Sequence, residues 1–133
     1  MPGCVLRVGS KSLRVERLVR ASGLRPIAIH KKGRPRVPGG VTLCRASGFN
    51  VDVSVVDGDV KRQARDAIRF LTRHARGLAR LRRCSHFDGM VLDFGLYYRA
   101  TPDRPWPSYR LPAALVALAG KHGIEIELSF YGA

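Results

Sequence analysis

Strict alternation of apolar and polar residues is the feature that most constrains the fold of this chain. Between residues 49 and 55, 90 and 97, and 124 and 131, every second side chain is apolar. Such alternation predicts half-buried β-strands, with one face in the core and one face in water. The two segments between these strands place apolar residues three or four positions apart, which predicts helices that cover the buried face. A sheet covered on one side is therefore expected.

The first half of the chain predicts two further strands and a helix. Residues 4–8 are β-rich and predict a first strand, and the helix that follows should end at Gly23. Glycine readily adopts the left-handed backbone that closes a helix. Residues 26–30 predict a second strand. A third strand is expected over residues 41–55, with a bulge or break near Ser47-Gly48.

The longest predicted helix begins near Val60. Asp57 or Asp59 precedes it and can accept hydrogen bonds from the first backbone amides of the helix. Gly77 is a candidate for dividing this helix into two segments near His74.

The predicted order of elements is β-α-β-β-α-β-α-β, with the last helix opening at Leu111-Pro112. This order predicts the α+β class. Specifically, it predicts a two-layer sandwich in which helices cover one face of a mixed, mostly antiparallel sheet. A length of 133 residues fits a single domain over residues 1–133.

Positive charge is high and unevenly distributed. The chain has a net charge of +14, and residues 1–83 hold 20 of its 24 Lys and Arg residues. A basic domain attracts polyanions and steers their approach. However, 19 of these cations are Arg, a bias that GC-rich coding also produces on an ordinary solvated surface. Charge by itself therefore supports nucleic-acid binding only weakly.

Several functional classes find no support in the sequence. No apolar run approaches the roughly 20 residues that span a bilayer, and no signal peptide is recognisable, so we expect a cytoplasmic protein without membrane insertion. Cys4, Cys44 and Cys84 match no zinc or redox spacing. We expect no metal site, no cofactor and no catalytic residue of a known motif. A cryptic active site stays open as an alternative.

The polar sides of the predicted strands form the first candidate site. They carry carboxylates and tyrosines on an otherwise basic chain. One interpretation is a solvated face with carboxylates paired to arginine, for which Arg99 or Arg110 is the expected partner. A second is an acidic recognition surface for a basic protein, and a third is a carboxylate pair for acid–base catalysis. The candidate partner-binding residues are Asp52, Asp93, Tyr97, Glu125, Glu127 and Tyr131, and the same predicted face carries Asn50, Ser54 and Ser129.

A stripe of arginines on the long helix is the second candidate site. Arginine suits phosphate, and a basic stripe is typical of nucleic-acid binding. The stripe lacks the stacking aromatics of single-strand binders, so a solvated face or an anionic membrane surface are the alternatives. The candidate polyanion-binding residues are Arg62, Arg69, Arg73, Arg76 and Arg80, together with Lys31, Lys32, Arg34 and Arg36 of a basic loop.

A proline-rich loop over residues 101–109 carries the only tryptophan, Trp106. Such a loop commonly packs back on its domain, whereas an exposed tryptophan is a plausible anchor for a binding partner. Trp106 is therefore a third candidate.

The chain resembles a family of small bacterial proteins of about this length, known as a domain of unknown function. The resemblance covers nearly the whole chain and is clearest over residues 47–131. It implies a fold and supplies no catalytic residue. The segments that carry it are Ser47–Val51, Ala67–Leu71, Leu92–Gly95, Arg110–Pro112 and Gly123–Tyr131.

The sequence favours a non-enzymatic protein-interaction module from a bacterium, with a protein partner that the sequence does not identify. Immunity proteins, which neutralise a partner toxin, are modules of this kind, and the analogy rests on size and on missing active-site motifs. The alternative is a non-specific nucleic-acid-binding protein that uses the Arg-rich helix.

Overall fold

The computed structural model describes residues 2–98 and 100–132, and its elements follow the predicted sequence of strands and helices. The long helix is divided into two helices that meet at His74. In chain order the elements are β1 (Cys4–Ser10), α1 (Val15–Ser22), β2 (Ala28–His30), β3 (Ser47–Ser54), α2 (Val60–Arg73), α3 (Ala75–Arg82), β4 (Phe87–Tyr97), α4 (Ala113–Lys121) and β5 (Ile124–Tyr131).

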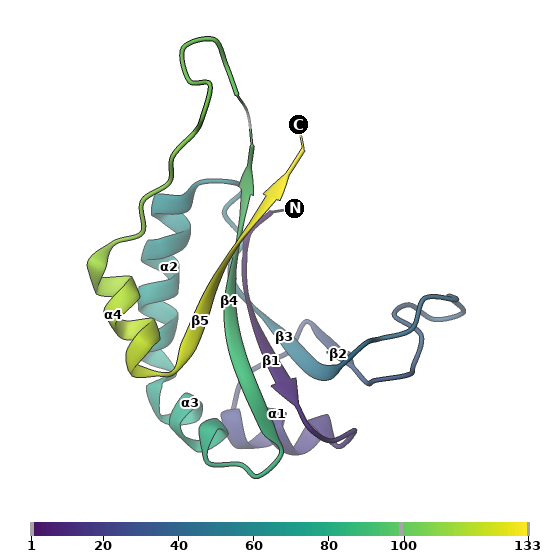
Figure 1. The fold of residues 1–133 in the computed structure, drawn as a ribbon. Helices are drawn as coiled ribbons and strands as arrows, with labels where there is room; N and C mark the ends of the chain where they lie inside the picture. The colour runs from purple at the N-terminus through teal and green to yellow at the C-terminus, as the bar shows by residue number, and fades with distance from the viewer. Residues whose placement is uncertain (1, 99, 133) are drawn as a thin grey trace.

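The strands form one five-stranded sheet in the order β2-β3-β1-β4-β5. Strand β1 lies at the centre and pairs antiparallel with β3 and β4, and β2 pairs antiparallel with β3. Strand β5 pairs parallel to β4, with α4 as the connection between them. The helices all lie on one side of the sheet (Figure 1). The predicted α+β class and the mixed, mostly antiparallel sheet are confirmed.

The core lies between the sheet and the helices, where the alternating strand residues meet the apolar helix stripe. Leu6, Phe49, Leu71, Leu92 and Phe94 are all fully buried there. The buried layer is continuous from α1 to α4, because each helix contributes at least one residue to it.

One buried polar residue, Gln63 on α2, was not anticipated. Its Nε2 atom lies 3.0 Å from the carbonyl oxygen of Pro2, 2.9 Å from that of Val56 and 3.0 Å from that of Gly95. A buried amide that meets several backbone acceptors ties their segments together. Gln63 therefore connects the N-terminal segment, the β3–α2 loop and strand β4.

The prediction for the third strand was wrong at its start. Residues 31–46 form a projecting arm, called here the 31–46 arm, in which the segments around Arg34 and Leu43 fold back on each other. The amide of Arg36 donates to the oxygen of Thr42 at 2.9 Å, and the amide of Cys44 donates to that of Arg34 at 2.7 Å. In Figure 1 the arm extends away from the helix layer.

Of the two predicted alternatives near Ser47-Gly48, the break is present, since β3 begins at Ser47, whereas the bulge in β3 lies at its other end. Cys4 is opposite Ser54 while Val5 is opposite Asp52, so Val53 has no partner on β1. The extra residue reverses the alternation. As a result Ser54 faces the helices, where its hydroxyl donates to Asp66 Oδ2 at 2.7 Å, and it does not lie on the polar sheet face as predicted.

Gly77 has a packing role that differs from the predicted one. The helix breaks at His74, as predicted, but Gly77 lies three residues further along, inside α3, and is not at the break. A Cβ atom on Gly77 would come within 2.1 Å of the backbone oxygen of Ser22. Since real Cβ atoms do not approach an oxygen so closely, this glycine allows α1 and α3 to pack against each other.

Leu71→Ala tests the assignment of the buried helix face. Leu71 is fully buried, so its truncation should lower the free energy of unfolding by about 2–5 kcal/mol. The matched control is Leu13→Ala, at a position that is half exposed, where we expect a loss below about 1 kcal/mol. Urea unfolding measures both values, and equal losses would show that the helix face is wrong.

Candidate functional site

An arginine at the centre of the open sheet face, Arg7 on β1, joins two of the predicted acidic residues. Its Nη1 atom lies 3.0 Å from Oδ2 of Asp93 on β4, and Nη2 pairs with Oε2 of Glu127 on β5. The Ser129 hydroxyl donates to the other oxygen of Asp93 at 2.5 Å. The centre of this face is therefore an ion cluster in which one arginine is shared by two carboxylates.

The burial of Asp93 makes the pairing in this cluster more important for stability. The Asp93 side chain is only 14% exposed, whereas those of Arg7 and Glu127 are 41% and 49% exposed. A carboxylate with little access to water depends on its partners for the hydrogen bonds that water would supply. This geometry favours the interpretation in which sheet-face carboxylates are paired to arginine.

The paired cation differs from the expected ones. Arg99 lies outside the described residues, and Arg110 lines a depression with Val60 and Lys61 at the start of α2. Arg7 was not anticipated because its contact with Asp93, which is diagonal across the β1–β4 pair, depends on β1 lying beside β4 in this register. Alternation within a single strand shows which face a side chain occupies but not which strand lies beside it.

The other predicted sheet-face residues lie apart from this cluster. Asp52 lies across β1 from Asp93, because Val5 is the register partner of both. Glu125 and Tyr131 are exposed on β5. The Tyr97 hydroxyl is turned toward the β3–α2 loop, where it lies 2.9 and 3.1 Å from the two carboxylate oxygens of Asp57. The structure thus brings together Asp93 and Glu127 but not the whole predicted set.

Aromatic side chains gather at the end of β5, where the strand forms one edge of the sheet. The Phe130 ring lies 6.1 Å from that of Tyr98 and 5.8 Å from that of Tyr109, between centroids. Phe130 and Tyr98 are each about half exposed, and Trp106, in the loop that also carries Tyr109, is 79% exposed. Trp106 therefore does not pack back on the domain. We call Tyr98, Trp106, Tyr109, Phe130 and Tyr131 the aromatic edge.

The predicted arginine stripe is exposed on the outer side of the helix layer. The break at His74 divides it, with Arg76 and Arg80 on α3 and the others on α2. Arg80 Nε donates to the backbone oxygen of Ala21 at 3.0 Å. Within residues 2–98 and 100–132 the only cations in ion pairs are Arg7 and Lys31. The stripe, Arg62, Arg69, Arg73, Arg76 and Arg80, thus has no carboxylate partner in these ranges.

A shallow pocket of about 210 Å³ beside this stripe contains an aromatic pair that sequence analysis missed. The rings of Phe70 and His74 lie 4.6 Å apart, between centroids, and Arg69 and Arg73 line the same pocket. Burial, and then the charge of Arg73, lower the pKa of His74. The spacing of Phe70 and His74, four residues apart on a helix, was the available signal.

The predicted basic loop lies on the 31–46 arm, away from the helical stripe. Lys31 Nζ pairs with Glu16 of α1 at 2.7 Å. Lys32, Arg34 and Arg36 are exposed. Because the arm extends away from the helices (Figure 1), the two predicted basic sets form separate surfaces.

No group of three or more His, Cys, Asp or Glu side chains in the described ranges is placed to hold a metal ion. None of the described helices combines the length and apolarity needed to cross a membrane. Comparison of the chain with protein-family models, curated proteins and solved structures gave no match.

Asp93→Asn tests the ion cluster on the open face. The substitution removes the charge-assisted hydrogen bond from Arg7 to a carboxylate that is only 14% exposed, so the free energy of unfolding should fall by about 1–3 kcal/mol. Glu125→Gln removes the same charge from an exposed residue two positions from Glu127, and we expect a change below about 0.5 kcal/mol there. Equal effects in urea unfolding would show that the cluster does not stabilise the sheet.

Proposed function

We propose that the protein is a non-enzymatic protein-interaction module that binds its partner along β5 and the aromatic edge. The observation that carries this proposal is an edge strand with exposed aromatic side chains beside it. Edge strands present unpaired backbone donors and acceptors, and a partner can add a strand to them. Tyrosine and tryptophan supply large contact areas at low entropic cost.

The two edges of the sheet differ in what they offer. Strand β2 has three residues, whereas β5 has eight. Natural edge strands are commonly protected by lysine, proline or inward-pointing charges. Strand β5 contains neither lysine nor proline, and of its two charges Glu127 is directed toward Arg7. Glu125 is therefore the one charge of β5 that is left to interact with a partner.

These features describe the partner chemically. An extended segment with apolar side chains would pack against Leu128 and Phe130, which are 38% and 51% exposed. A basic or hydroxyl side chain on the same segment would lie near Glu125. Of the acidic recognition surface predicted for a basic partner, only Glu125 remains available. An immunity-type role, in which binding neutralises a toxin, is one function that a surface of this kind serves.

Partner capture tests this proposal. Trp106→Ala and Phe130→Ser should each remove the partner that the wild-type chain captures from a lysate of its source cells, measured by quantitative mass spectrometry. Val41→Ser, at a 94% exposed residue of the 31–46 arm, removes a similar apolar group and should leave capture unchanged. Unchanged melting temperatures confirm folding, and full capture by both edge variants would refute the proposed surface.

A second candidate function, binding of single-stranded nucleic acid, is favoured by the pocket beside the arginine stripe. The paired rings of Phe70 and His74 offer a surface on which a base can stack, and Arg69 and Arg73 lie at the same pocket to contact phosphate. Basic grooves with stacking aromatics are typical of single-strand binding.

Salt dependence separates specific use of this pocket from general attraction. Replacing Arg69 and Arg73 together by alanine should weaken binding of a labelled single strand and reduce the slope of log K against log salt by about 1.4. Phe70→Leu should weaken binding without changing the slope. In the control, the exposed Arg17 and Arg25 are together replaced by alanine, which removes the same charge as the Arg69 and Arg73 double variant. Fluorescence anisotropy measures all of these, and equal losses in both double variants would rule out a pocket-specific mode.

A further inference from the structure

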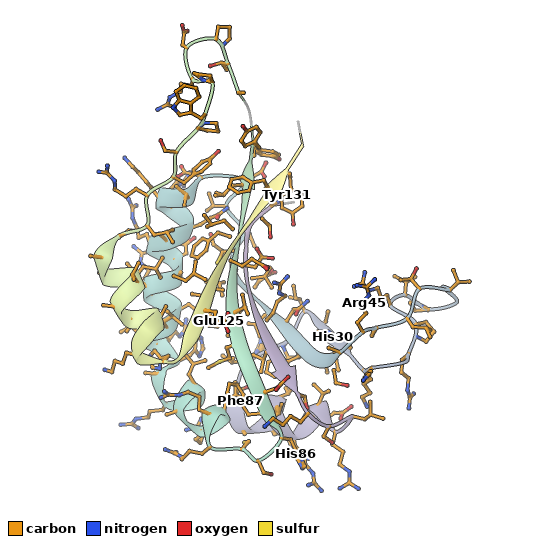
Figure 2. All side chains as sticks on the ribbon, viewed as in Figure 1. His30, Arg45, His86, Phe87, Glu125 and Tyr131 are labelled. Atoms are coloured by element: carbon orange, nitrogen blue, oxygen red, sulfur yellow. The ribbon has the colours of Figure 1, made fainter. Side chains whose placement is uncertain are left out.

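A groove of about 430 Å³ lies on the open side of the sheet, between strand β2 and the 31–46 arm. Its walls include His30 of β2, Arg36 and Arg45 of the arm, and Arg7 of β1, with Asn50 of β3 beside them. In Figure 2 the side chains of His30 and Arg45 both lie on the side of the sheet that faces away from the helices. Four basic side chains from three separate segments therefore converge on one space.

The position of His30 is built into the sheet. Its register partner is Gly48 on β3, and a Cβ atom there would come within 3.1 Å of His30 Nε2 and 2.1 Å of the oxygen of Val8. The glycine thus leaves room for the imidazole ring to lie over the neighbouring strand. The ring therefore lines the groove, where it can meet a ligand.

Two of the groove's three arginines have no carboxylate partner among the described residues. Neither Arg36 nor Arg45 forms an ion pair within the described ranges, while Arg7 is shared with Asp93 and Glu127 on its far side. Burial, followed by the charges of Arg36 and Arg7, lowers the pKa of His30. The oxygen Oδ1 of Asn50 is buried and finds no hydrogen-bond donor among the described residues.

We propose that this groove binds a phosphate monoester with an attached organic group, such as a nucleotide, free or at the end of a nucleic-acid strand. Arginine presents a planar fork of donors that matches the oxygens of a phosphate. A volume of about 430 Å³ exceeds what a bare ion needs and lies in the range of small-molecule sites. Rotation of the Asn50 amide would turn a donor or an acceptor toward the organic group.

The groove and the proposed protein-binding surface lie at opposite ends of the strand order, on β2 and β5. The inference is therefore independent of the proposed function, and either can fail without the other. It is also distinct from the helical stripe, because the groove is on the open side of the sheet and the stripe is on the helix layer.

Titration calorimetry with 5′-AMP, inorganic phosphate and citrate tests the groove directly. We expect AMP to bind more tightly than phosphate, and citrate to bind more weakly than AMP. Arg36→Ala and Arg45→Ala should each weaken AMP binding at least 10-fold. Arg65→Ala is the matched control, because it removes the same charge from an exposed residue of α2, and its affinity should stay within about 2-fold of wild type.

Oligonucleotides distinguish the two sources of the phosphate. If a strand of ten nucleotides binds better with a 5′-phosphate than without it, the groove recognises the end of a nucleic-acid strand. AMP binding without any effect of that phosphate indicates a free nucleotide. Absence of AMP binding, equal binding of citrate, or equal losses in Arg65→Ala and Arg36→Ala would each overturn the proposed site.

Proton NMR of the histidine rings gives a second readout that a general charge effect would not reproduce. A bound dianion stabilises imidazolium, so saturating AMP should raise the pKa of His30 by at least about half a unit. His74 and His122 also have lowered pKa values but lie outside the groove, and they should not move. A uniform shift of all three, or no shift of His30, would contradict binding in the groove.

Discussion

The helices cover only one face of the sheet, and the remaining structure is arranged around that constraint. Strand β1 runs through the centre with neighbours on both sides, so Leu6 and Val8 can be fully enclosed while Arg7 between them points the other way. A central strand with one wet face needs polar side chains whose hydrogen bonds are satisfied there. Arg7, Asp93 and Glu127 meet this need together, and they connect β1, β4 and β5 through side chains as well as through backbone.

The same arrangement separates the charges of the molecule. Two carboxylates of the open face, Asp93 and Glu127, pair with Arg7, whereas the arginines of α2 and α3 are on the helix layer and have no carboxylate partner in the described ranges. A second unbalanced group of cations lies where the 31–46 arm approaches β2. The unpaired arginines therefore form two separate surfaces, one on the helix layer and one beside β2.

The two edges of the sheet differ in exposure for a related reason. Strand β2 is short and adjoins the arm, which builds a groove over it. Strand β5 follows directly from α4, so its C-terminal half extends beyond the helix that precedes it. There Leu128 and Phe130, which alternation assigns to the core face, keep 38% and 51% of their surface in water. Alternation predicts toward which face of the sheet a side chain points, but the side chain is buried only where another layer of the structure covers that face.

Local patterns in the sequence were sufficient for most elements of this protein, the start of β3 being the exception. The alternation over residues 90–97 and 124–131, the cap at Asp59 and the terminator Gly23 each act within a few residues, so they could be interpreted from the chain itself. The pairing of Arg7 with Asp93, the bulge at Val53, and the groove between His30 and Arg45 could not be predicted. They depend on which strands become neighbours and in what register, and residues 86 positions apart meet only after the whole sheet has formed.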